Sequence, residues 1–195
     1  MTDFAYSPMF PLGEDTTEYE LVSTDHVALV ELGGDTFLKV EPEALRLLSQ
    51  RAFTDISHLL RSSHLAQLAS ILDDPEATQN DRFVALEMLK NAVVAADGLL
   101  PMCQDTGTAI IAGTRGDHVL VSGDEGEALS RGVFDTYQQS NLRYSQLAAT
   151  SMFDEVNTAT NLPAQIDLYA GTGLEYKFAF IQKGGGSANK TFLHQ

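Results

Sequence analysis

The sequence is short of residues on which several classes of protein depend. It has one cysteine, Cys103, no tryptophan, and only 12 lysine and arginine residues against 27 acidic ones. One cysteine cannot form an intrachain disulfide, which favours a reducing compartment, and we expect the cytoplasm. The net charge of −15 and the lack of any basic cluster argue against a nucleic-acid partner, because phosphate binding depends on gathered lysines and arginines.

Long apolar runs and targeting signals are missing as well. No run approaches the roughly 18 residues that a bilayer-crossing helix needs. Residues 1–10 have an acid at position three and no basic region, so they do not resemble a secretory signal. We therefore expect no membrane partner. An ordinary 44% of the residues are hydrophobic, which is enough to build a core.

The spacing of apolar residues predicts strands, then helices, then strands. Two β-prone runs, 26–32 and 36–40, flank Gly33-Gly34-Asp35, which is a good hairpin signal. Thr78 and Asp81 form a loose capping box at the start of a helix. Further helices are expected over residues 43–61, 65–74 and 125–141, and strands over residues 19–23, 118–122, 165–170 and 174–182. This order predicts an α+β fold with mixed or antiparallel strands and several packed helices.

The first segment that could support chemistry contains Cys103, Gln104 and Asp105. Pro101 and Gly107 flank it, which predicts a loop. A thiolate is a soft ligand and a nucleophile, an amide donates hydrogen bonds without charge, and a carboxylate accepts protons. A buried, inert cysteine beside an Asx turn is an alternative that composition leaves open. Structural zinc is disfavoured because it needs several Cys or His ligands at short spacing.

Arg143 lies at the end of the helix expected over 125–141. It is either a cation that satisfies the helix dipole or a bidentate clamp for a substrate carboxylate. Both interpretations fit the residue type and its position.

A third segment, residues 183–191, is rich in glycine and reads KGGGSANKT. It resembles a phosphate-binding P-loop, but Asn189 stands where the last glycine is needed, so nucleotide binding through Gly184–Thr191 is disfavoured. Consecutive glycines let a bulky group or another backbone come close, and their amides can form an anion-binding concavity. A flexible turn is the simpler alternative.

Together these segments resemble class I fumarases, the iron–sulfur-dependent fumarate hydratases. Residues 100–110, LPMCQDTGTAI, resemble the cluster-ligand motif, and residues 183–191 resemble the glycine-rich signature. Segments 141–145 and 155–167 match between them, and the resemblance covers essentially the whole chain. Met102 stands where the resemblance implies a small or polar residue such as threonine. Family members are well over twice as long, so the resemblance implies that residues 1–195 are an incomplete N-terminal hydro-lyase domain, without the C-terminal domain.

The resemblance also implies a function and a set of site residues. The enzymes hydrate fumarate reversibly to (S)-malate, use a 4Fe–4S cluster held by three cysteines, and generally form homodimers. Only one of those cysteines is present here, so we expect the isolated chain to be inactive. A related tartrate or mesaconate hydro-lyase is the alternative within this class. The implied roles are cluster ligation by Cys103, substrate carboxylate binding by Gln104 and Arg143, proton transfer or orientation of the base by Asp105, substrate binding through the backbone N–H of Gly186, and added positive field from Lys190.

Overall fold

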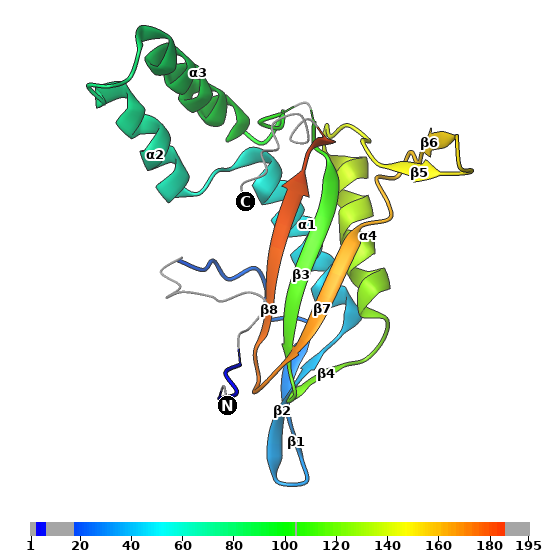
Figure 1. The fold of residues 1–195 in the computed structure, drawn as a ribbon. Helices are drawn as coiled ribbons and strands as arrows, with labels where there is room; N and C mark the ends of the chain where they lie inside the picture. Colours follow the sequence, from blue (N-terminus) through cyan, green and yellow to red (C-terminus); the bar gives the residue numbers. More distant parts are fainter. Residues whose placement is uncertain (1–2, 7–17, 104, 186–195) are drawn as a thin grey trace.

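The computed structural model describes residues 3–6, 18–103 and 105–185. Gln104, Gly186 and Lys190 therefore lie outside the described residues. The elements, in chain order, are β1 (Val27–Leu32), β2 (Asp35–Val40), α1 (Pro42–His58), α2 (Ser62–Asp73), α3 (Gln79–Ala95), β3 (Thr108–Gly116), β4 (Val119–Val121), α4 (Glu125–Gln139), β5 (Leu147–Ala149), β6 (Glu155–Asn157), β7 (Gln165–Gly171) and β8 (Tyr176–Lys183) (Figure 1). This mixture of helices and strands confirms the α+β class.

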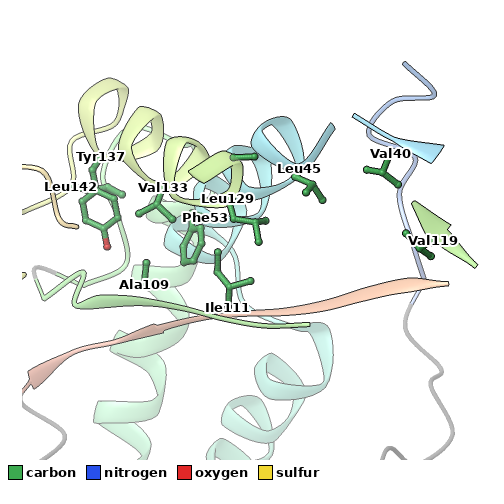
Figure 2. Close-up of a cluster of buried hydrophobic side chains, with 11 residues drawn as sticks. Val40, Leu45, Phe53, Ala109, Ile111, Val119, Leu129, Val133, Tyr137 and Leu142 are labelled. Carbon is green, nitrogen blue, oxygen red and sulfur yellow. The ribbon is translucent and has the colours of Figure 1, made fainter. Parts of the chain in front are cut away.

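The centre of the fold is a mixed three-stranded sheet with two helices on one face. The strand order is β7-β3-β8, with β7 parallel and β8 antiparallel to β3. Every second residue of β3 points to the helices, so Ala109 and Ile111 are fully buried. Helices α1 and α4 cover this face, and Figure 2 shows their apolar side chains above the strands. They contribute Leu45, Phe53, Leu129, Val133 and Tyr137. Burying a side chain as large as Phe53 contributes about 1.5–3 kcal/mol.

A glycine of α4, Gly132, lies against the backbone of α1 where the two helices pack. A Cβ at Gly132 would lie 2.6 Å from the Cβ of Ser49. The hydroxyl of Ser49 donates to the carbonyl oxygen of Leu129 at 2.8 Å. At the edge of the contact, Arg46 pairs with Asp135 at 2.7 Å. The small residue permits the approach, and the polar contacts set how the two helices align.

A smaller sheet extends the molecule at one end. The predicted hairpin is confirmed, with β1 and β2 antiparallel, and β4 adds to it parallel to β2. Helices α2 and α3 pack together and project away from the central sheet (Figure 1). The capping box of α3 is confirmed, because Thr78 accepts from the amide of Asp81 while Asp81 accepts from that of Thr78.

Several features differ from what the sequence predicts, and α1 ends at His58, before the expected Arg61. Described residues 19–23 form no strand. Helix α4 ends at Gln139, before the expected Asn141. The short antiparallel pair β5–β6 has no signal in the sequence, since three-residue strands are too short to show alternation. Among the described residues, no helix combines the length and the apolar character that spanning a bilayer requires.

Candidate functional site

The strand order brings three loops to one edge of the central sheet. Strands β3 and β7 are parallel, with Ile110 opposite Gln165, so both begin at this edge. Strand β8 is antiparallel to β3, with Thr108 opposite Lys183, so it ends there. The loop before β3, the segment before β7 and the start of the glycine-rich segment must therefore meet (Figure 1). The first and the last of these are segments that the sequence singles out, whereas the segment with Arg143 lies between α4 and β5.

The described residues on either side of Gln104 are held by the two helices. On one side the amide of Met102 donates to the carbonyl oxygen of Ser57, at the end of α1, at 3.0 Å. On the other, the hydroxyl of Tyr137 donates to the carbonyl oxygen of Thr106 at 2.7 Å. Burial raises the pKa of Tyr137 to about 12, so this hydroxyl keeps its proton at neutral pH. Helix α1 thus holds the chain at Met102, and helix α4 holds it at Thr106.

Gly107 is required where the loop enters β3. Its φ is +60°, and a Cβ there would overlap the carbonyl group of Lys183 at the end of β8. Any other residue would be strained in this conformation and would push the two strands apart. The loop therefore lies directly against the start of the glycine-rich segment.

Cys103 and Arg143 line the same open cavity, although they are separated by 40 residues in sequence. The cavity has a volume of about 360 Å³, and Leu100, Pro101 and Asn141 complete its described lining. Cys103 is exposed, so the alternative of a buried, inert cysteine is wrong. Arg143 lies beyond the end of α4 at Gln139, so it does not satisfy the dipole of that helix.

Asp105 lies between Arg143 and the glycine-rich segment. Arg143 Nη2 donates to Asp105 Oδ1 over a long 3.4 Å, and the two side chains are 62% and 29% exposed. A Cβ at Gly184 would lie 2.8 Å from Asp105 Oδ2. The close neighbour that the consecutive glycines predicted is, at Gly184, this carboxylate. A thiol, a carboxylate and a guanidinium consequently share one edge of the sheet.

Side chains that the sequence did not single out connect these segments through hydrogen bonds to the backbone. The hydroxyl of Thr106 donates to the carbonyl oxygen of Arg143 at 2.7 Å. The side chain of Asn161 is fully buried and bonds to the backbone of Ser145, Gln146 and Gly107. One signal was available for Asn161, since asparagine is enriched at positive φ and in turns, and it stands here at φ +57°.

The described residues do not form a metal site by themselves. Among residues 3–6, 18–103 and 105–185, no three or more His, Cys, Asp or Glu side chains are gathered as metal ligands. Cys103 is a free, exposed cysteine at an open cavity. The predicted roles of Gln104, Gly186 and Lys190 fall on residues that the structure does not describe.

Comparison with known proteins shows a family whose sequence pattern covers the candidate site. The sequence model of the family described as fumarate hydratase (Fumerase) matches residues 47–195, which include every residue of the candidate site. The chain belongs to the fumarate hydratase family. The family resemblance that the sequence motifs indicated is thereby confirmed.

Relatives agree with this family over nearly the whole chain. The chain is 58% identical to "Fumarate hydratase class I, anaerobic" of Escherichia coli (strain K12) over 192 residues, 98% of this chain and 35% of the relative. It is 57% identical to the aerobic class I enzyme of the same strain, with the same coverage. It is also 57% identical to "Fumarate hydratase 1, mitochondrial" of Leishmania major over 198 residues, 100% of this chain and 36% of the relative. The chain thus spans about a third of the length of the fumarate hydratases that it matches.

Proposed function

We propose that this chain supplies part of the active site of an iron–sulfur-dependent hydro-lyase that interconverts fumarate and (S)-malate. The observation that carries the proposal is the open cavity lined by Cys103 and Arg143, with Asp105 beside the guanidinium. Because the chain belongs to the fumarate hydratase family, we interpret these three residues as parts of a fumarate site. A dicarboxylate substrate needs a cation, and hydration needs a group that handles a proton.

The residues of the cavity fit a 4Fe–4S cluster that is bound through one of its iron atoms to Cys103. Thiolates are the ligands that hold such clusters, and Cys103 is exposed on a loop at a cavity. Because the described residues offer one thiolate there, the remaining ligands come from elsewhere, as expected for a cluster held by three cysteines. When bound, the cluster would supply Lewis-acid stabilisation of charge on a substrate oxygen.

Each described residue has a role that suits its chemistry. Arg143 binds a substrate carboxylate, because a guanidinium presents two parallel donors that match it. Asp105 accepts or returns the proton at its carboxylate, or orients the group that does so. The contact between the two keeps the acceptor beside the bound dianion. In the hydration direction a water oxygen adds to one alkene carbon and a proton to the other, and dehydration reverses both.

The other parts of the proposal rest on the family resemblance. Gln104 binds a carboxylate through its amide, Gly186 binds substrate through its backbone N–H, and Lys190 adds positive field. We also propose a homodimer without a nucleic-acid or membrane partner. For its location we propose the cytoplasm. One of the relatives is named mitochondrial.

The test uses the protein expressed from its complete gene, with the cluster reconstituted under anaerobic conditions. Fumarate hydration, iron and acid-labile sulfide are measured for the unaltered protein and for Cys103→Ser. We expect the variant to lose both cluster and turnover, because a required ligand is removed. Met102→Thr is the matched control, since it alters the neighbouring side chain and retains the backbone bond to Ser57.

Substrate arms separate the alternatives. Higher kcat/KM with tartrate or mesaconate than with fumarate would assign the chain to a related hydro-lyase. Tight binding of ATP without hydration would favour the nucleotide-binding alternative. A Cys103→Ser protein that retained cluster and turnover would remove the ligand assignment.

A further inference from the structure

Asn161 connects the two segments that form the site. Its Oδ1 accepts hydrogen bonds from the amides of Ser145 and Gln146, at 2.8 and 3.0 Å. Its Nδ2 donates to the carbonyl oxygen of Gly107 at 2.9 Å. Two amides follow Arg143 closely in sequence, and the carbonyl belongs to the loop that contains Cys103 and Asp105. One side chain thus joins the backbone beside the cation to the backbone beside the thiol.

The position of this side chain is strongly determined. Asn161 is 0% exposed, and hydrogen bonds in such surroundings are costly to lose because water cannot replace them. Its backbone stands at φ +57°, which asparagine and glycine tolerate better than other residues. Serine or alanine would lose the bonds, and a larger residue would not fit a fully buried place. Only an amide of this length bonds both segments at once.

Arg143 is held between two such contacts. Thr106 Oγ1 donates to its carbonyl oxygen at 2.7 Å on one side, and Asn161 fixes the amides of Ser145 and Gln146 on the other. The side chain of Arg143 is itself 62% exposed, so its own contacts do little to hold it. The backbone bonds therefore hold the point from which the side chain extends, and the guanidinium is directed by its long contacts to Ser145 Oγ and Asp105 Oδ1, each at 3.4 Å.

We infer that Asn161 is a positioning residue, which orients Arg143 toward Asp105 and Cys103 so that the cavity accepts a dicarboxylate. This rests on the proposed function, in which Arg143 binds a substrate carboxylate. Thr106 and Gly107 keep an independent support, since Tyr137 also donates to their carbonyl oxygens, at 2.7 and 3.3 Å. Loss of Asn161 thus releases the amides of Ser145 and Gln146 that follow Arg143, and leaves both the loop and the bond from Thr106 to Arg143 in place.

The experiment compares two glycine substitutions in the protein expressed from its complete gene. Asn161→Gly keeps the left-handed backbone accessible and removes all three side-chain bonds. Ala159→Gly is the matched control, because Ala159 also stands at positive φ, +55°, but is exposed. Both variants gain the same backbone freedom in the same loop. Only the first loses the contacts to Ser145, Gln146 and Gly107.

Three measurements compare Asn161→Gly with Ala159→Gly. Hydrogen exchange in peptides covering residues 141–149 reports the release of the Ser145 and Gln146 amides. Calorimetry with succinate, a dicarboxylate that is not hydrated, reports binding without turnover. Steady-state kinetics separate KM from kcat. For Asn161→Gly we expect faster exchange, and a succinate Kd and a KM for fumarate raised about tenfold, with a smaller change in kcat. Ala159→Gly changes each less than about twofold.

Asn161→Asp tests the geometry more finely. It retains an acceptor for the two amides and loses the donor to Gly107, so we expect exchange near Ser145 to stay slow and succinate affinity to lie between the other two variants. If Asn161→Gly fails to fold, as judged by circular dichroism and thermal unfolding, this variant decides the comparison.

The outcomes separate this inference from the proposed function. Faster exchange with unchanged succinate affinity would reduce Asn161 to a purely structural residue and overturn the inference. Unchanged exchange would overturn it as well. If the unaltered protein binds succinate but does not hydrate fumarate, the proposed reaction fails, while a weaker succinate Kd in Asn161→Gly would still support the positioning role. If the unaltered protein does not bind succinate, both fail.

Discussion

At the scale of the residue, the candidate site is built from side chains that contribute little to stability. The contact between Arg143 and Asp105 is long, 3.4 Å, and largely exposed on the arginine side. Surface ion pairs of this kind contribute about 0–1 kcal/mol to folding. The arrangement of the site residues is instead held by buried neighbours such as Asn161 and Tyr137. Chemistry and stability are thus divided between different residues of the same edge.

Arg143→Lys is expected to lower activity without lowering stability. The lysine keeps the charge and loses the planar pair of donors, so we expect kcat/KM for fumarate to fall about 10- to 100-fold. The free energy of unfolding should change by less than about 0.5 kcal/mol, because the side chain is mostly exposed. Steady-state kinetics and urea denaturation measure the two effects. Arg51→Lys, an exposed arginine paired with Asp55 on α1, is the control and should alter neither.

At the scale of the element, the crossing of α1 and α4 fixes where the site's supports lie. Tyr137 is on α4 and Ser57 is on α1, and each bonds to the loop around Cys103. Any change in the distance between these helices therefore reaches the loop.

Gly132→Ala should be destabilising for this reason. The added Cβ would lie 2.6 Å from that of Ser49, and overpacking of this kind costs about 1–3 kcal/mol. Gly126→Ala on the same helix is the control. There the nearest atom is Oδ1 of the N-cap residue Asp124, at 3.3 Å, which needs to shift by only a few tenths of an ångström while it still accepts from the amide of Glu127, and alanine is the better helix former. Equal thermal stability of the two variants would contradict the close-packing argument.

The capping box predicts a local effect at the start of α3. Thr78→Ala removes the hydroxyl that accepts from the amide of Asp81, at 3.2 Å, and should cost about 1 kcal/mol of helix stability. Hydrogen exchange of the first turn of α3 measures it, since the helix pair projects from the rest of the molecule. Thr78→Ser keeps the acceptor and should exchange at the original rate. Unchanged exchange in the alanine variant would show that the box does not hold the helix start.

At the scale of the whole molecule, the buried Tyr137 and the half-buried Tyr176 make stability depend on alkaline pH. Burial raises the pKa of Tyr137 to about 12, from an ordinary value near 10. Burial and a hydrogen bond to Glu125 raise the pKa of Tyr176 as well. The unfolded chain releases these protons at lower pH than the folded chain does. Their contribution to stability is therefore complete below about pH 10 and is lost as the pH rises toward 12.

Denaturation by urea at a series of pH values tests this sign. The free energy of unfolding should fall between about pH 10 and 12, with about 2 kcal/mol of the loss due to Tyr137. Tyr137→Phe should be less stable at neutral pH, because its bond to Thr106 is gone, yet show a shallower fall in the alkaline range. A fall of equal slope in both proteins would show that Tyr137 does not titrate as described.

The sequence by itself determined the family, the order of most elements and the three segments of the site. Those features are local: apolar spacing marks a helix, Gly33-Gly34-Asp35 marks a hairpin, and Thr78 with Asp81 marks a helix start. Only the tertiary structure decided that Cys103, Asp105 and Arg143 meet, that Cys103 is exposed, and that Asn161 joins them. Strand pairing and helix packing connect residues far apart in the chain, and no local pattern records which loops share an edge of the sheet.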